Sequence, residues 1–155
     1  MSGDTTTDLR SDFIERMGLI AQGEGMPRSA GRMLALLIWD GEPIAFADLA
    51  ATLQISRGNV STSARLLEER GLVRRVSRPA ERQDFFQIAP NAFLSMLNGT
   101  RVRIENAMGE IEKVLETLPA REQGPRTRLT EYAEFYRAIA DGLQTAVDRL
   151  QSPGR

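Results

Sequence analysis

The chain has 155 residues, a formal net charge of −1, 41% hydrophobic and 26% charged residues, a composition typical of a globular protein. It contains neither cysteine nor histidine, which excludes disulfides, catalytic triads of the Ser-His or Cys-His type, and zinc sites with sulfur or imidazole ligands. No apolar run approaches the roughly 18 residues of a membrane span, and the polar N-terminus does not resemble a secretory signal, so we expect a cytoplasmic protein.

The first forty residues predict two helices. Residues 1–7 are too polar to bury apolar surface, and we expect them to be disordered. A helix is predicted over residues 8–21, ending at Gly23, because apolar residues recur there at helical spacing: Leu9, Phe13, Met17 and Ile20. A second helix is predicted from Ser29, a candidate N-cap, to about Trp39. Its expected buried positions are Met33, Leu34, Leu36, Leu37 and Ile38.

Two short amphipathic helices follow and meet at a tight polar corner. Residues 46–53 form the first, with Phe46, Leu49, Ala50 and Leu53 facing inward. Ser56 caps the second, which runs to Arg70 and stops at Gly71. This arrangement is typical of a helix-turn-helix.

The corner itself follows a steric pattern. Ala50 is small where the second helix must cross the first, and Val60 is a branched apolar residue placed to fill the corner. Glycine usually supplies the left-handed backbone of the turn, but the chain has Gln54 there. A non-glycine residue costs about 1–2 kcal/mol in that conformation, so either the turn differs or the strain is accepted.

Short strands surround the helix-turn-helix. Residues 42–45 are predicted to form a strand that joins a hairpin of residues 72–78 and 84–89, with Pro79 and Ala80 at its tip. This order predicts a winged helix-turn-helix, which places one helix in the DNA major groove and a hairpin over the neighbouring backbone.

The candidate DNA-binding residues lie on the polar face of the second helix and around the hairpin tip. Small and hydrogen-bonding side chains near a helix N-terminus suit deep entry into the groove, and arginine suits guanine, phosphate or a narrow minor groove. They are Ser56, Arg57, Gly58, Asn59, Ser61, Thr62, Arg65, Arg78 and Arg82. From residue 56 to 83, seven arginines against three glutamates give a local charge of +4. A solvated, salt-bridged face is the alternative interpretation.

After Pro90 the pattern predicts two long helices in a hairpin, broken at Pro119 and at the Gly124-Pro125 pair. Apolar residues recur there at spacings of 3 and 4, as in a helical interface. The first seam comprises Leu94, Leu97, Arg101, Ile104, Met108, Ile111, Leu115 and Leu118. The second comprises Leu129, Tyr132, Tyr136, Ile139, Leu143, Ala146 and Leu150. Such seams form a core or an interface between two copies, so a homodimer is expected.

Five aromatic residues could line a ligand pocket between the winged helix and the C-terminal helices, although their helical spacing favours ordinary packing. They are Trp39, Phe93, Tyr132, Phe135 and Tyr136. No motif identifies an effector-binding residue. No catalytic residue, metal or cofactor is expected, and no carboxylate pair lies in a setting that would mark an active site, so the chain is predicted not to be an enzyme.

The segment from Met17 to Val76 resembles the MarR superfamily, and more specifically its GbsR-type branch. The residues that carry the resemblance are EGMPRSAGR, starting at Glu24, and SRGNVSTSARLLEERGLV, starting at Ser56. The Glu81-Arg82 pair resembles the acidic-Arg pair of MarR wings. The resemblance implies an obligate dimer that binds a pseudo-palindromic operator, often as a repressor released by a small molecule. Some GbsR-type proteins are linked to choline and osmoprotectant genes.

The sequence thus predicts a mainly α fold with a small β wing, in three parts. Residues 1–26 are expected to contribute a helix to dimerisation, residues 27–90 to form the winged helix-turn-helix, and residues 91–155 to form helical dimerisation segments. The predicted function is sequence-specific DNA binding in transcription regulation. A winged-helix module that binds only proteins is the alternative.

Overall fold

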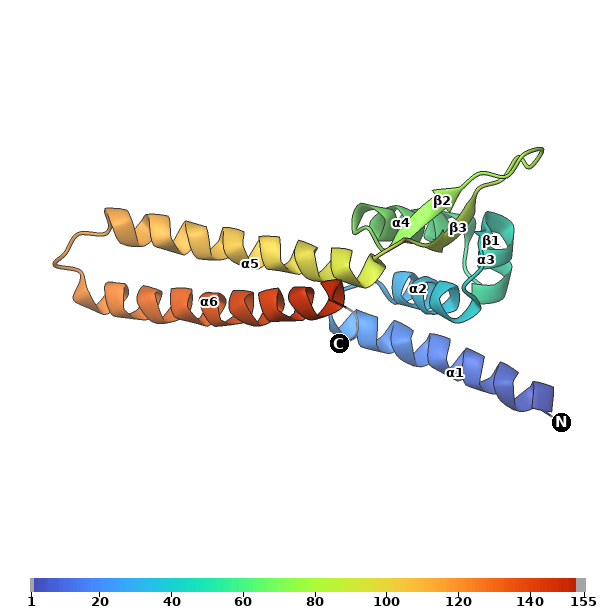
Figure 1. Cartoon of the computed structure of the whole chain (residues 1–155), viewed down its shortest axis with the longest axis horizontal. Helices are drawn as coiled ribbons and strands as arrows, with labels where there is room; N and C mark the ends of the chain where they lie inside the picture. Colours follow the sequence, from blue (N-terminus) through green and yellow to red (C-terminus); the bar gives the residue numbers. More distant parts are fainter. Residues whose placement is uncertain (1, 153–155) are drawn as a thin grey trace. The chain divides into compact units, whose positions relative to one another are not determined.

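A computed structural model of the chain describes residues 2–152, with side chains from Thr5 onward. The chain divides into two compact units, Met1–Ala92 and Phe93–Arg155. The first holds four helices and a small sheet, and the second holds most of a helical hairpin (Figure 1). The predicted mainly α fold with a β wing is confirmed.

Helix α1 spans Ser2–Gly23, so the expected disorder of residues 1–7 is wrong for residues 2–7, while Met1 lies outside the described residues. No proline or glycine interrupts the chain between Asp4 and Met17, and a helix anchored further along extends at little cost over such a stretch. The anchor includes a bidentate ion pair from the Arg10 guanidinium to the Asp40 carboxylate at the end of α2, at 2.8 and 2.7 Å. The predicted end of the helix at Gly23 is confirmed.

Helix α2 spans Arg28–Asp40 and is capped by Pro27, so Ser29 is not the N-cap that the sequence suggested. Its hydroxyl instead accepts a hydrogen bond of 3.0 Å from Ser63 in α4. The expected burial of Ile38 is also wrong, because its side chain is 39% exposed. The helix buries a stripe of Met33, Leu36 and Leu37, and Ile38 lies one position beyond it.

Helices α1 and α2 approach closely at Gly31. A Cβ atom added to Gly31 would lie 2.4 Å from the Cβ atom of Ala21 and 3.2 Å from the Cα atom of Gly18. Both neighbours are too short to move aside, so the two helices would have to separate. The absence of a side chain at Gly31 therefore sets the distance between them.

We expect Gly31→Ala to lower the free energy of unfolding by about 1–3 kcal/mol, as overpacking does. The overpacking should outweigh the roughly 1 kcal/mol that alanine gains over glycine inside a helix. Denaturant unfolding at a fixed protein concentration measures the change. Gly142→Ala is the matched control, because nothing lies within 4 Å of a Cβ atom there, and it should be neutral or stabilising. A stabilised Gly31→Ala variant would contradict the close approach.

Helices α3, Phe46–Leu53, and α4, Arg57–Glu69, form the predicted helix-turn-helix. Gln54 has a left-handed backbone, with φ 52° and ψ 46°, so the chain accepts the strain of a non-glycine residue at the turn. Amide donors satisfy the end of α3, since Ile55 N donates to the Ala50 carbonyl oxygen at 3.1 Å. Val60 is fully buried in the corner, as predicted.

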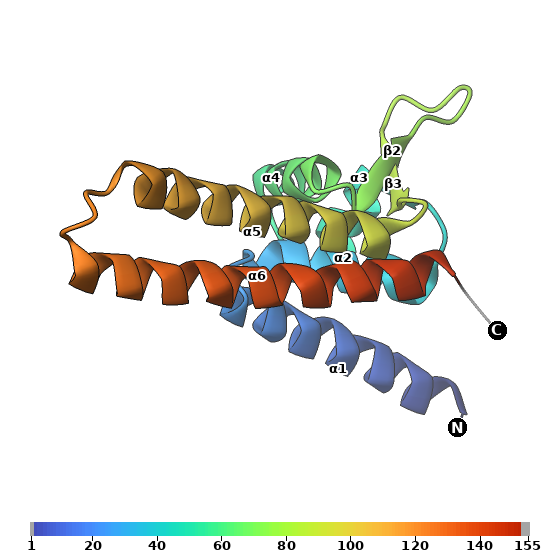
Figure 2. The same ribbon diagram turned by 60° about the vertical axis from the view of Figure 1, so that its left-hand side comes forward.

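The sheet has three antiparallel strands in the order β1-β3-β2, so the expected strand before α3 does join the wing. The strands are β1, Ile44–Ala45, β2, Val73–Val76, and β3, Phe85–Ile88. Beyond the paired residues the chain between β2 and β3 extends as a long loop (Figure 2). Phe86 on β3 is 1% exposed and packs into the core that α2, α3 and α4 share.

The C-terminal hairpin consists of α5, Ala92–Thr117, and α6, Gln123–Gln151. Pro119 ends α5 as expected, but Gly124 and Pro125 do not break the helix, because they lie in the first turn of α6. A proline there costs no hydrogen bond, since the first four amides of a helix have no partner within it.

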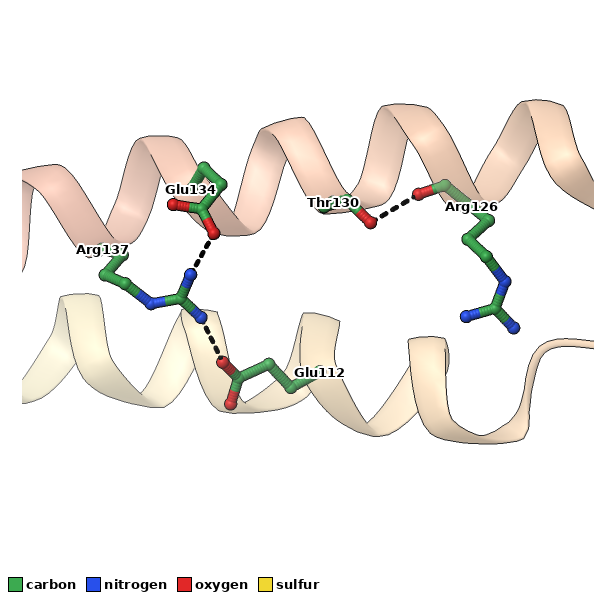
Figure 3. A network of polar contacts seen from close by, with 5 residues as sticks. All are labelled: Glu112, Arg126, Thr130, Glu134 and Arg137. Atoms are coloured by element: carbon green, nitrogen blue, oxygen red, sulfur yellow. Dashed lines mark hydrogen bonds and ion pairs between the residues drawn. The ribbon is translucent and has the colours of Figure 1, made fainter.

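Polar contacts join α5 to α6 (Figure 3). The Arg137 guanidinium on α6 donates to Glu112 on α5 at 3.0 Å and also pairs with Glu134 on its own helix. The Arg126 guanidinium donates to the Leu118 carbonyl oxygen at 2.6 Å, which caps the end of α5. These exposed and half-exposed contacts fix the pairing of the helices but contribute little to stability.

The apolar seam predicted for α6 is not its buried line. The buried residues are Ala133, Ala140 and Val147, which recur every seven positions. Residues of the predicted seam are half-buried or exposed, and Tyr132 and Leu150 are 48% and 50% exposed. The seam predicted for α5 is half-buried along its length. Small residues therefore pack within the hairpin, and the larger apolar side chains of α6 are left without full cover in the single chain.

Candidate nucleic-acid interface

The N-terminal half of α4 presents a polar surface that is open to solvent. Ser56 is the N-cap, and its hydroxyl oxygen accepts a hydrogen bond of 3.1 Å from the Asn59 amide, as predicted. All predicted contact residues of this segment are exposed: Ser56, Arg57, Gly58, Asn59, Ser61, Thr62 and Arg65. The structure thus brings these residues together on one surface of one helix.

The opposite side of α4 fixes the helix in the module. Val60, Ala64 and Leu67 are at most 1% exposed and belong to the core. Ser63, the one buried polar residue among those described, donates its hydroxyl to Ser29 at the start of α2. Because the inner side chains of α4 are buried in the core, the helix is fixed in place, and its outer side can bind a ligand without rearrangement of the helix.

Two local contacts organise the outer side. The Arg57 guanidinium lies 4.8 Å from the ring centroid of Phe46, a cation–π contact. The Thr62 hydroxyl donates to the Gly58 carbonyl oxygen at 2.9 Å, so its oxygen remains free to accept. A Cβ atom on Gly58 would meet only the Ser56 hydroxyl, at 3.8 Å. No close packing inside the protein therefore accounts for glycine at this position.

Arg75 connects the wing to α4, a role that the sequence analysis missed. Its Nε atom donates to Glu68 at 3.2 Å and its Nη1 atom donates to Asp84 at 2.9 Å. The guanidinium also lies 5.4 Å from the ring centroid of Phe86, directly across the β2–β3 pair. The charged side chain of Arg75 indicates an exposed position. Its partners lie in α4 and around the start of β3, and they are not evident from spacing.

The wing loop carries the two remaining predicted contact residues, and both are exposed. The Arg78 guanidinium lies 4.3 Å from the Phe85 ring centroid, which restrains it at the base of the loop. Ala80 takes a left-handed backbone with φ 66° at the tip. Within residues 2–152, Arg82 forms no ion pair with its neighbour Glu81. Arg82 therefore keeps its hydrogen-bond donors available.

Four of the five aromatic residues considered for a ligand pocket make ring contacts within their own units. Trp39 contacts Phe13 in a tilted arrangement, with ring centroids 5.6 Å apart and an angle of 42° between the rings. Tyr132, Phe135 and Tyr136 cluster on α6, and the two tyrosine hydroxyls lie 3.1 Å apart. In residues 2–152, no helix combines the length and hydropathy that crossing a membrane requires.

Comparison with known proteins gives concordant matches. Residues 24–83 match the model of the MarR family. The HTH-type transcriptional regulator MmpR5 of Mycobacterium tuberculosis is 36% identical over 106 residues, which make up 68% of this chain and 62% of that protein. The chain therefore spans less than two thirds of this curated relative. A crystal structure of a transcriptional regulator superposes with a TM-score of 0.76 at 26% identity, covering 92% of this chain and 97% of that chain.

Proposed function

We propose that this chain, a winged-helix protein of the MarR family, is a cytoplasmic transcriptional regulator that binds double-stranded DNA as a homodimer. The observation that carries the proposal is the outer side of α4, where small, polar and cationic side chains are all exposed while the inner side is locked into the core. Within the family, the EGMPRSAGR and SRGNVSTSARLLEERGLV segments favour the GbsR-type branch.

The proposed DNA contacts fall into two groups, those of α4 in the major groove and those of the wing outside it. The α4 surface from Ser56 to Arg65 enters the major groove, where Arg57 and Arg65 bind guanine or phosphate and the small polar residues bind phosphate or base edges. Arg78 and Arg82 reach the neighbouring backbone or minor groove from the wing. Arg75 positions the wing by holding Glu68 and Asp84 and does not itself contact DNA.

The exposed apolar face of the C-terminal hairpin supports the proposal of a homodimer. Large apolar side chains of α6, including Tyr132, Phe135 and Leu150, are about half exposed in the single chain. An interface between two copies would cover them and would place two winged helices on one pseudo-palindromic site. We propose the hairpin and α1 as the dimerisation elements.

Selection of bound fragments from the source genome, followed by titration of a selected duplex, tests the function. A regulator binds the selected duplex far more tightly than random DNA, and the difference persists at physiological salt. Absence of duplex binding even at low salt would favour the alternative, a winged-helix module that binds only proteins. A thermal-shift screen with cationic and aromatic metabolites distinguishes an effector-controlled dimer from a constitutively bound one.

Arg82→Ala should weaken binding to selected and random duplexes alike, because a wing arginine contacts backbone that carries little sequence information. The dependence of log affinity on log salt should become shallower by about one unit for each protomer that loses a phosphate contact. Fluorescence anisotropy at several salt concentrations measures both quantities. Arg121→Ala, an exposed arginine outside the winged helix, is the control, and an unchanged slope in Arg82→Ala would refute the role of Arg82.

A further inference from the structure

An open cavity of about 410 Å³ lies inside the first unit, beside the corner of the helix-turn-helix. Its walls are Glu15 of α1, the first turns of α2, and the end of α3 with the turn that follows. The contributing residues are Glu15, Arg28, Ser29, Arg32, Leu53 and Gln54. Gln54 precedes the N-cap of α4 by two residues, so the cavity borders the end of the helix that carries the proposed base contacts.

The cavity holds two guanidinium groups and one carboxylate. Arg28 Nη2 donates to one oxygen of Glu15 at 2.9 Å, and Arg32 Nε donates to the other at 2.8 Å. Partial burial raises the pKa of Glu15, but the hydrogen bonds from Arg28 and Arg32 outweigh it and lower the pKa below its usual value. A single carboxylate leaves the group with one uncompensated positive charge. Arg32 Nη2 lies 2.7 Å from the same Glu15 oxygen that Nε contacts. In residues 2–152, the other N–H donors of the two arginines have no protein acceptor.

The two arginine side chains are held in place by their stems. A Cβ atom on Gly18 of α1 would lie 2.5 Å from Cγ of Arg32 and 3.3 Å from Cγ of Arg28. Both stems therefore cross α1 where it has no side chain. The Arg32 side chain is only 18% exposed, while that of Arg28 is 49% exposed. The Arg32 guanidinium is thus held at the cavity, whereas the Arg28 guanidinium lies at its half-exposed edge.

The alternative is a purely structural clamp, in which ion pairs only hold α1 against α2. Such a clamp would account for one of the two ion pairs of Glu15 but not for both together with the cavity. The bidentate Arg10–Asp40 pair already joins the two helices, and a clamp needs neither a second guanidinium on Glu15 nor an open cavity. Two arginines with unused donors around an open, polar space suit an oxyanion, because guanidinium and phosphate geometries match.

We propose that this cavity binds a phosphate of the DNA backbone next to the major groove that α4 enters, with Arg28 and Arg32 as the ligands. Glu15 holds the two guanidiniums in free protein and competes with the phosphate for them. The Ser63–Ser29 hydrogen bond joins the start of α2 to the inner side of α4. The proposed phosphate contact and the proposed base contacts therefore come from helices that are packed directly against each other. The inference rests on the proposed DNA binding and adds a third contact beyond the helix and the wing.

The test compares Arg28→Gln, Arg32→Gln and Glu15→Gln in titrations of the selected duplex over a range of salt. Either arginine variant should flatten the salt slope by about 0.9 for each protomer and lower the affinity. Glu15→Gln should raise the affinity without flattening the slope, because it removes the competing carboxylate. A purely structural clamp gives the opposite sign for Glu15→Gln, a weaker complex, together with unchanged slopes for the arginine variants, and would overturn the proposal.

Two further measurements separate the remaining outcomes. Arg28→Lys keeps the charge and should retain the slope that Arg28→Gln flattens, so equal slopes in these two variants would overturn the proposal. Arg32→Gln carries the test if Arg28→Gln fails to fold. Inorganic phosphate at constant ionic strength should raise the melting temperature of the wild type more than that of Arg28→Gln. If it does so while the DNA slope of Arg28→Gln is unchanged, the site takes a free anion and the backbone contact is refuted. Failure of the wild type to bind any duplex refutes the proposed function; binding without these changes refutes this inference alone.

Discussion

Replacing Arg57 by glutamate should abolish specific DNA binding while leaving the protein folded, a loss of at least about 100-fold in affinity for the selected duplex. The residue occupies the first position of α4 and is exposed. In the proposed complex its guanidinium lies against phosphate or guanine, and a carboxylate there would be repelled by the backbone. Juxtaposed like charges cost several kcal/mol at an interface, and 1.4 kcal/mol corresponds to a factor of ten. A dimer carries the change twice.

The stability of the same variant should change little. Arg57 loses a cation–π contact with Phe46, worth about 0.5–1 kcal/mol at an exposed site. A glutamate in the first turn of α4 gains a similar amount, about 0.3–1 kcal/mol, because acidic side chains complement the positive end of the helix dipole. The thermal unfolding midpoint should therefore stay close to that of the wild type, which excludes unfolding as the cause of lost binding.

Arg70→Glu provides the matched control for Arg57→Glu. It makes the same change of net charge at the other end of α4, where Arg70 is the exposed C-cap. The proposed docking predicts a much smaller loss for Arg70→Glu, because that end of the helix is not in the groove. Equal losses in the two variants would mean that only the overall charge matters, and the N-terminal half of α4 would not be the contact surface.

Local patterns predicted the winged helix well because each element carries its own signal. The N-cap at Ser56 and the limits of α3 follow from residue type and helical spacing, and the structure has them as expected. The left-handed backbone at Gln54 is one of the two alternatives that the sequence left open. The polar surface of α4 followed from the same periodicity, since burial of Val60, Ala64 and Leu67 leaves the other side in solvent. Whether that surface contacts DNA stays a prediction.

Contacts between distant segments could not be read from the sequence. Ser29 looked like a cap, but its hydroxyl finds Ser63 across the core, which no local rule foresees. The wing depends on Arg75, whose partners Glu68 and Asp84 come from either side of it in the chain. In α6 the apolar spacing suited more than one face, and the line that became buried consists of small residues such as Ala133 and Ala140.

The uncovered face of α6 leads to the second large expected effect: Phe135→Asp should convert the dimer into a monomer. Phe135 is 57% exposed in the single chain and touches Tyr136 edge-on, with ring centroids 5.6 Å apart. The chain's own fold therefore depends little on this ring. In an interface between two identical copies, two aspartates would be buried without partners, at a cost of several kcal/mol each.

Sedimentation analysis at micromolar concentration should show a monomer for Phe135→Asp and a dimer for Thr145→Asp, which places the same charge at an exposed polar position of α6. Affinity for a two-half-site duplex should fall by roughly 10²–10⁴-fold in the monomer, because the second winged helix no longer binds at high effective concentration. Affinity for a duplex with one half-site should be nearly unchanged, which separates loss of dimerisation from damage to α4. A Phe135→Asp variant that remains a dimer would exclude this face of α6 from the interface.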